Sequence, residues 1–165
     1  MRIDFVSDVA CPWCAIGLRE LEIALERLAP EVRPELHFQP FELNPQMAAE
    51  GQDATEHLVQ KYGVTEAQLE RTREAMRARG ESIGFAFGTR SRIWNTFDAH
   101  RLIHLAATYG HQAAAQERLM RAYFSDGEAI SDAETLIRLM AELGVDADEA
   151  RDVLETGRFT DDVRE

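Results

Sequence analysis

The sequence predicts an α/β protein in which a strand–helix–strand opening is followed by a long helical segment. Two short runs, Arg2 to Ser7 and Glu35 to Phe41, alternate apolar and polar residues as half-buried strands do, and a stretch with leucines at helical spacing separates them. Helical periods then dominate the chain for more than a hundred residues. We expect residues 1–43 to form a βαβ portion, residues 44–157 an all-helical insertion, and residues 158–165 the start of a returning helix.

The first helix is expected to begin directly at a Cys-Pro-Trp-Cys turn after the first strand. Pro12 suits the first helical turn, because the N–H that it lacks would have had no partner there. The leucine repeat continues to Ala29-Pro30, where we expect the helix to end. Pro40 places the second strand near an edge or an end. A connection between parallel strands of this kind is right-handed.

Capping and stop signals divide the helical segment. Thr65 with Gln68 resembles a capping box, and Gly80 is expected to end the helix that starts there. The alternating apolar residues between 83 and 87 are interpreted as an extended loop. The later start signals are Trp94-Asn95-Thr96 before a helix to Tyr109, a helix from about Gln112 to Phe124, Ser131 with Glu134, Asp146 with Glu149, and Thr160 to Asp162.

Composition excludes several classes of function. The chain has 18 basic and 30 acidic residues, and the acidic residues are spread along it, which argues against a nucleic-acid surface. No stretch has the length and apolar composition of a signal peptide or a membrane span. We therefore expect a cytoplasmic protein, in which an isolated C-x-x-C is more often a redox or metal site than a structural disulfide.

Cys11 and Cys14 are the only cysteines, and their spacing places both sulfurs on the first turn of the expected helix. Unpaired backbone N–H groups and the helix dipole favour negative charge at that position. Cys11 is therefore predicted to be the attacking thiolate, and Cys14 the thiol that resolves a mixed disulfide.

Neighbouring residues are expected to tune this dithiol rather than react. Pro12 and Trp13 shape its surroundings, and Trp13 offers an apolar surface beside the sulfur. Asp8 either raises the thiol pKa or moves protons for Cys14, or it is a solvated turn residue.

A zinc site is the main alternative for the dithiol, since two thiolates at this spacing make half of one. His100 and His104 lie four residues apart and offer two nitrogens. No second cysteine pair and no recognised carboxylate motif completes the set, so we expect no metal. The two histidines are instead interpreted as structural, with hydrogen bonds inside the helical region.

Trp94, Asn95 and Phe97 have two interpretations. They either line a cleft beside the dithiol, or Asn95 caps a helix while the two aromatic residues pack in the core. The apolar run between 83 and 87 likewise offers either a substrate surface or core packing.

Three motifs resemble those of the DsbA-like thioredoxin-fold oxidoreductases, specifically the FrnE-type cytoplasmic subgroup. They are SDVACPWC from Ser7 to Cys14, FELNP from Phe41 to Pro45, and NTFDAHRLIHLA from Asn95 to Ala106. The resemblance implies a thioredoxin fold split by a helical domain that covers the active site, with Cys11 as nucleophile and Cys14 as resolving cysteine. Relatives include 2-hydroxychromene-2-carboxylate isomerases and kappa-class glutathione transferases, which typically carry serine at the first position.

The resemblance also implies further strands and a cis-proline loop facing the dithiol. The five prolines, the last of which is Pro45, do not provide that loop. Either the chain is truncated and its C-terminal strands are missing, or a partner chain completes the sheet; we favour truncation. The exposed sheet edge is expected to favour self-association into a homo-oligomer.

Thiol-disulfide exchange is the function that the dithiol predicts. The expected partners are protein or small-molecule thiols and disulfides, with no nucleic acid and no membrane. No bound cofactor is expected beyond a thiol pool such as glutathione. The alternatives are a glutathione-dependent isomerase or transferase, and a non-catalytic holdase that binds unfolded peptides.

Overall fold

A parallel pair of strands with a helix between them forms the N-terminal part of the computed structural model, which describes residues 1–165. Strand β1 (Arg2–Ser7) pairs with β2 (Glu35–Pro40), in a register that sets Arg2 opposite Glu35 and Ser7 opposite Pro40. Helix α1 (Pro12–Leu28) connects them. The βαβ prediction is confirmed, and Pro40 stands at the end of its strand, where a missing N–H is tolerated.

Helices make up most of the remaining chain. Their bounds, with those of a second small antiparallel sheet, are β3 (Gln52–Asp53), α2 (Ala54–Tyr62), α3 (Glu66–Ile83), β4 (Arg92–Ile93), α4 (Phe97–Thr108), α5 (Gln112–Phe124), α6 (Ala133–Glu142), α7 (Ala147–Glu155) and α8 (Thr160–Arg164). The α5 prediction is confirmed, as are the capping box of α3 and the capping of α7 by Asp146. The β3–β4 pairing was not predicted.

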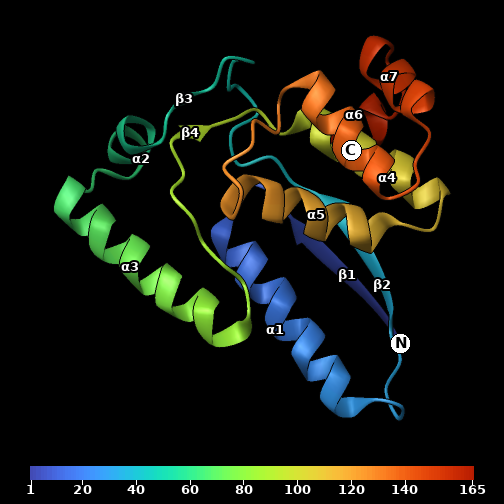
Figure 1. The fold of residues 1–165 in the computed structure, drawn as a ribbon, viewed down its shortest axis with the longest axis horizontal. Helices are drawn as coiled ribbons and strands as arrows, with labels where there is room; N and C mark the ends of the chain where they lie inside the picture. Colours follow the sequence, from blue (N-terminus) through green and yellow to red (C-terminus); the bar gives the residue numbers. More distant parts are fainter.

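The helical segment and the sheet pack directly on each other. Helix α5 lies against β2 and α1, while α4 packs on α5, α7 and α8 (Figure 1). Helix α3 extends on the far side of α1, next to α2. The division at residues 43 and 157 therefore stays a prediction, because these segments share packing surfaces.

The buried core holds the start of α1 in place. Its largest members come from α4, α5 and α6, including Leu102, Leu119 and Leu139, which are fully buried. Val9 and Ala10, in the turn after β1, belong to the same cluster. The dithiol turn is therefore anchored by side chains from distant helices.

The prediction that Gly80 ends a helix is wrong. Helix α3 continues to Ile83 and ends at Gly84, whose φ of 78° is the left-handed conformation that glycine adopts easily. Gly80 serves a different purpose: a Cβ there would lie 2.3 Å from the carbonyl oxygen of Phe85. The glycine allows the chain after α3 to fold back on the helix. Phe85 is buried in that returning loop and contacts Phe87 and Phe124, which is core packing.

The predicted capping role of Ser131 is also wrong. Asp132 caps α6 instead, by accepting a hydrogen bond from the N–H of Thr135 at 2.9 Å. The Ser131 hydroxyl donates to the carbonyl of Ala49. A local pattern cannot distinguish two adjacent capping residues when one of them has a distant partner.

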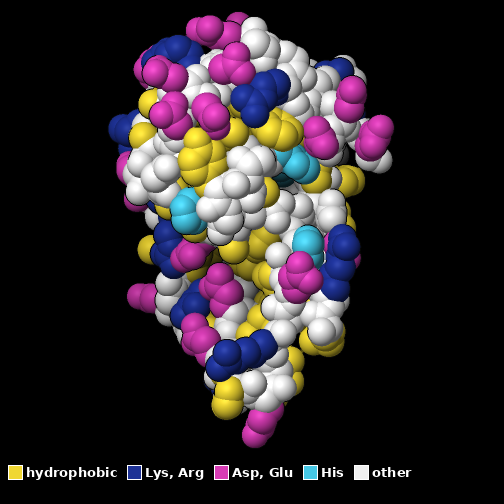
Figure 2. Space-filling model, turned by 90° about the vertical axis from the view of Figure 1, so that its right-hand side faces the viewer, with side chains coloured by type: hydrophobic (Ala, Val, Ile, Leu, Met, Phe, Trp, Pro, Cys, Tyr) yellow, Lys and Arg dark blue, Asp and Glu magenta, His cyan; other side chains and the backbone are white.

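Charged side chains of both signs are interspersed on the face drawn in Figure 2, with apolar side chains between them. None of the helices combines the length and the apolar composition that a bilayer span needs.

Candidate active site

The dithiol lies at the junction of β1 and α1. Cys11 is the N-cap residue of α1, and its Sγ accepts a hydrogen bond from the backbone N–H of Cys14 at 3.3 Å. Pro12 occupies the next position, where no N–H is required. Both cysteines are free thiols and partly buried. The arrangement gives Cys11 the cap position, where a thiolate accepts hydrogen bonds from the first helical turn.

The two sulfurs have opposite protonation preferences. The hydrogen bond with the Cys14 side chain, supported by backbone N–H groups, lowers the pKa of Cys11 to about 6, although burial and the charge of Asp8 oppose this. The same sulfur–sulfur hydrogen bond, together with burial, raises the pKa of Cys14 well above its ordinary value. At neutral pH the pair therefore consists of one thiolate and one thiol.

Pro12 and Trp13 lie on the outer side of this pair. The Trp13 side chain is 60% exposed, so it presents its ring to solvent at the start of α1. Pro12 lines a cavity between α3 and the loop after it. Neither side chain carries a titrating group, and the tuning role of the two residues stays a prediction.

Asp8 is buried, with 2% of its surface exposed, so the solvated-turn interpretation is wrong. Its Oδ2 accepts a hydrogen bond from the N–H of Leu43 at 2.8 Å. Its Oδ1 lies 3.2 Å from Nε2 of His100, which is equally buried. Nε2 also lies 3.1 Å from the carbonyl oxygen of Phe41. Because both neighbours are acceptors, we assign the proton to Nε2.

His100 is the residue near the dithiol that the sequence interpretation missed. Its hydrogen-bond partners, Asp8 and Phe41, lie in the N-terminal portion. The prediction that its hydrogen bonds lie inside the helical region is therefore wrong. His104 stacks on the ring of Phe159 instead. The two histidines therefore have separate partners. The only sequence signal was that an Asp and a His occur in two separated motifs, with no spacing to link them.

Asn95 and Trp94 contact residues other than the two cysteines. Asn95 Oδ1 accepts from the N–H of Phe97 at 2.9 Å, and its Nδ2 donates to the carbonyl of Met47. The Trp94 ring packs closely on Gly51, since a Cβ at Gly51 would lie 2.9 Å from it. Asn95 and Phe97 also line a cavity of about 500 Å³, which none of the dithiol residues borders. A role for Trp94 and Asn95 in lining the active site stays a prediction.

Comparisons with known proteins show the family and the fold of the chain. A family model described as a DsbA-like thioredoxin domain matches residues 2–165. A probable DsbA oxidoreductase from Streptomyces coelicolor has a similar structure, with 35% identity and a TM-score of 0.93 over 99% of this chain and 72% of that protein. The uncharacterized protein YwbO of Bacillus subtilis is 26% identical over 163 residues, which are 98% of this chain and 75% of that protein. The cytosolic disulfide reductase DsbM of Pseudomonas aeruginosa, in its structure with GSH, shares the fold at 22% identity, with a TM-score of 0.60 over 99% of this chain and 78% of DsbM.

Proposed function

The chain belongs to the DsbA-like thioredoxin-domain family, and on that premise we propose that it exchanges disulfides through Cys11 and Cys14. The observation that supports this most directly is the position of Cys11 at the N-cap of α1, hydrogen-bonded to Cys14. Such a site combines a nucleophilic thiolate with a protonated neighbour, as dithiol exchange requires.

The exchange has two steps. The Cys11 thiolate attacks one sulfur of a substrate disulfide, forms a mixed disulfide, and releases the other half of the substrate as a thiolate. Cys14 then loses its proton and attacks the Cys11 sulfur, which releases the second half. The pair, which starts as one thiolate and one thiol, has lost two electrons and the one proton of Cys14. The substrate has gained two electrons and leaves as two thiolates, which take up protons according to pH.

Asp8 is proposed to act before the second step, by favouring the protonated form of Cys14. It is buried beside His100, and its negative charge acts on both sulfurs. A buried carboxylate at this position disfavours a second negative charge, so it adds to the hydrogen bond with Cys11 and to the burial that keep Cys14 protonated until the mixed disulfide forms.

The proposal includes a cytoplasmic location and a FrnE-type role, with a soluble thiol pool returning the dithiol to its starting state. The DsbM structure with GSH supports glutathione or a comparable thiol as that partner. No bound cofactor takes part in the two steps.

Trapping of the mixed disulfide tests this function. The Cys14→Ser variant, mixed with a reactive disulfide, should accumulate an adduct on Cys11 that intact-mass analysis detects and a reductant removes. The Cys11→Ser variant is the matched control, because it keeps one cysteine in the same turn but should form far less adduct. Equal labelling of the two variants, or no adduct on either, would contradict the assigned roles.

A further inference from the structure

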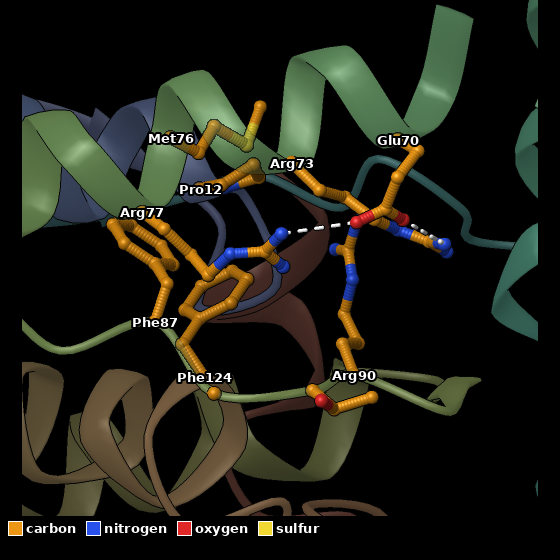
Figure 3. Close-up of a pocket in the computed structure, with 10 residues that line it drawn as sticks. Pro12, Glu70, Arg73, Met76, Arg77, Phe87, Arg90 and Phe124 are labelled. Carbon is orange, nitrogen blue, oxygen red and sulfur yellow. Dashed lines mark hydrogen bonds and ion pairs between the residues drawn. The ribbon is translucent and has the colours of Figure 1, made fainter. Parts of the chain in front are cut away.

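One cavity next to the dithiol carries a local excess of positive charge. It has a volume of about 140 Å³ and extends from Pro12 between α3 and the segment that leads from α3 to β4. Arg73, Arg77 and Arg90 line it together with a single acidic residue, Glu70. Figure 3 shows the guanidinium groups of Arg77 and Arg90 converging near the Glu70 carboxylate. The cavity therefore has two positive charges in excess, in a chain whose net charge is −12.

Glu70 does not neutralise all three arginines. Its carboxylate pairs with Arg77 at 3.0 Å and with Arg73 at 3.5 Å. Arg90, which is half-buried, has no carboxylate within 4.0 Å, and its hydrogen bond to the Ala10 carbonyl is long, at 3.5 Å. A half-buried guanidinium with donors to spare is suited to a carboxylate, whose two oxygens match its planar fork.

The position of Arg90 is fixed by its neighbours. Its guanidinium lies over the rings of Phe124 and Tyr123, at 5.6 and 5.8 Å from their centroids. Gly88 holds the preceding loop against α5, since a Cβ there would lie 2.8 Å from the carbonyl of Ser125. Because the residue is held in place before a ligand arrives, little conformational entropy is lost on binding.

We propose that this cavity binds the acidic arm of a small-molecule disulfide and presents its sulfur to Cys11, which makes carboxylate-bearing disulfides the preferred substrates. The cavity begins at Pro12, directly after Cys11, and Arg90 reaches the carbonyl of Ala10, directly before it. Its volume fits a carboxylate with a short chain and is smaller than the ~300 Å³ lower limit typical of whole-ligand pockets. The remainder of the substrate then lies outside the cavity, at the sulfurs.

This inference extends the proposed disulfide exchange, since it names the substrate class for that reaction. Three disulfides with similar size and different charge test it: dithiodiglycolate with two carboxylates, bis(2-hydroxyethyl) disulfide with none, and cystamine with two ammonium groups. The rate at which each oxidises the reduced protein is divided by its rate with dithiothreitol, which corrects for intrinsic reactivity. We expect dithiodiglycolate to exceed the neutral disulfide about three- to tenfold, since partly exposed ion pairs have modest strength. Cystamine should be the slowest.

Arginine variants locate the effect. Arg90→Gln and Arg77→Gln should each bring the ratio of the dithiodiglycolate rate to the neutral-disulfide rate, both measured on the same variant, close to one. Arg71→Gln is the matched control, because Arg71 is exposed on the same helix and does not line the cavity. An equal loss in Arg71→Gln, or no preference in the unmodified protein, would overturn the inference.

A binding measurement separates this inference from the proposed function. Thiodiglycolate, a thioether with two carboxylates, cannot exchange disulfides. Calorimetry or NMR titration should show that it binds the reduced protein weakly and binds the Arg90→Gln variant with lower affinity. Binding without any disulfide exchange would refute the proposed function and retain the cavity as a carboxylate site. Exchange without charge preference and without thiodiglycolate binding would refute the cavity alone.

Discussion

Replacing Cys14 by alanine should raise the pKa of Cys11, because the side-chain hydrogen bond from Cys14 is the largest cause that lowers it. The backbone N–H of residue 14, which lies 3.3 Å from the Cys11 sulfur, remains in the variant. The experiment therefore isolates the contribution of the side chain. Cys14→Ser is the matched comparison, since its hydroxyl keeps a donor at the same position.

The expected size follows from the strength of such a bond. A hydrogen bond to a charged group has a net free energy of about 1.5–3 kcal/mol, and the lower end applies to this partly exposed pair. About 1.4 kcal/mol corresponds to a tenfold change in the thiolate population. With a pKa of about 6, roughly one tenth of Cys11 is thiolate at about pH 5 in the reduced protein, and we expect about one hundredth in Cys14→Ala.

Alkylation by iodoacetamide measures this population, because only the thiolate reacts at an appreciable rate. At about pH 5, Cys14→Ala should react about tenfold more slowly than Cys14→Ser, and the two rates should converge at about pH 9, where both sulfurs are ionised. Superimposable pH profiles would show that the helix N-terminus alone stabilises the thiolate. The reasoning about the sulfur–sulfur hydrogen bond would then be wrong.

Three further changes test the surroundings of the dithiol. The free energy of unfolding of the reduced protein should rise with pH between about 6 and 9 relative to Cys11→Ala, by less than ~1.4 kcal/mol per pH unit. In this range the unfolded thiol keeps its proton, whereas the folded Cys11 has released it. His100→Phe should lower the free energy of unfolding by ~1–3 kcal/mol, because the buried Asp8 loses a partner. Gly80→Ala should lower the free energy of unfolding by ~1–3 kcal/mol. Steric overlap of the new Cβ with a backbone oxygen outweighs the ~1 kcal/mol by which alanine stabilises a helix relative to glycine.

Urea unfolding followed by circular dichroism measures all three changes, and each has a control. A pH-independent difference between the reduced protein and Cys11→Ala would contradict the first prediction. His104→Phe keeps an aromatic ring beside Phe159, so it should have a smaller effect than His100→Phe, and equal effects would argue against the Asp8 pair. Gly157→Ala meets no atom within 4 Å and should change stability by less than ~0.5 kcal/mol. A neutral or stabilising Gly80→Ala would refute the close-approach argument.

Local signals predicted much of the fold because the interactions behind them span only a few residues. The capping box of Thr65 and Gln68 joins residues three apart, and the structure contains both of its hydrogen bonds. Cys11 and Cys14 are joined in the same way at the start of α1. The prediction for Gly80 was wrong because a glycine can either end a helix or allow another backbone segment to approach closely. Only the position of Phe85 distinguishes them.

The surroundings of the dithiol could not be predicted in this way. Asp8 and His100 are 92 residues apart, and Ala10 and Arg90 are 80 apart. Each contact depends on how α4 or the loop after α3 packs against the turn after β1. No period or spacing in the sequence records that packing. The motifs identified both Asp8 and His100 as part of a resemblance, but their pairing required the folded chain.

Net charge is a poor guide to the ligand of such a site. A strongly acidic chain is expected to repel anions on average, yet charges act over a Debye length of only ~10 Å at moderate salt. The charges nearest to a ligand in the cavity at Pro12 are those of its lining residues, three arginines and one glutamate, and Arg90 has no carboxylate within 4.0 Å. The acidic surface farther away then affects the approach of a substrate more than its binding. Added salt should therefore speed the encounter with an anionic disulfide while weakening its hold in the cavity, so the two effects oppose each other. A measured preference for carboxylates that persists at low salt would show that the local arginines outweigh the net charge.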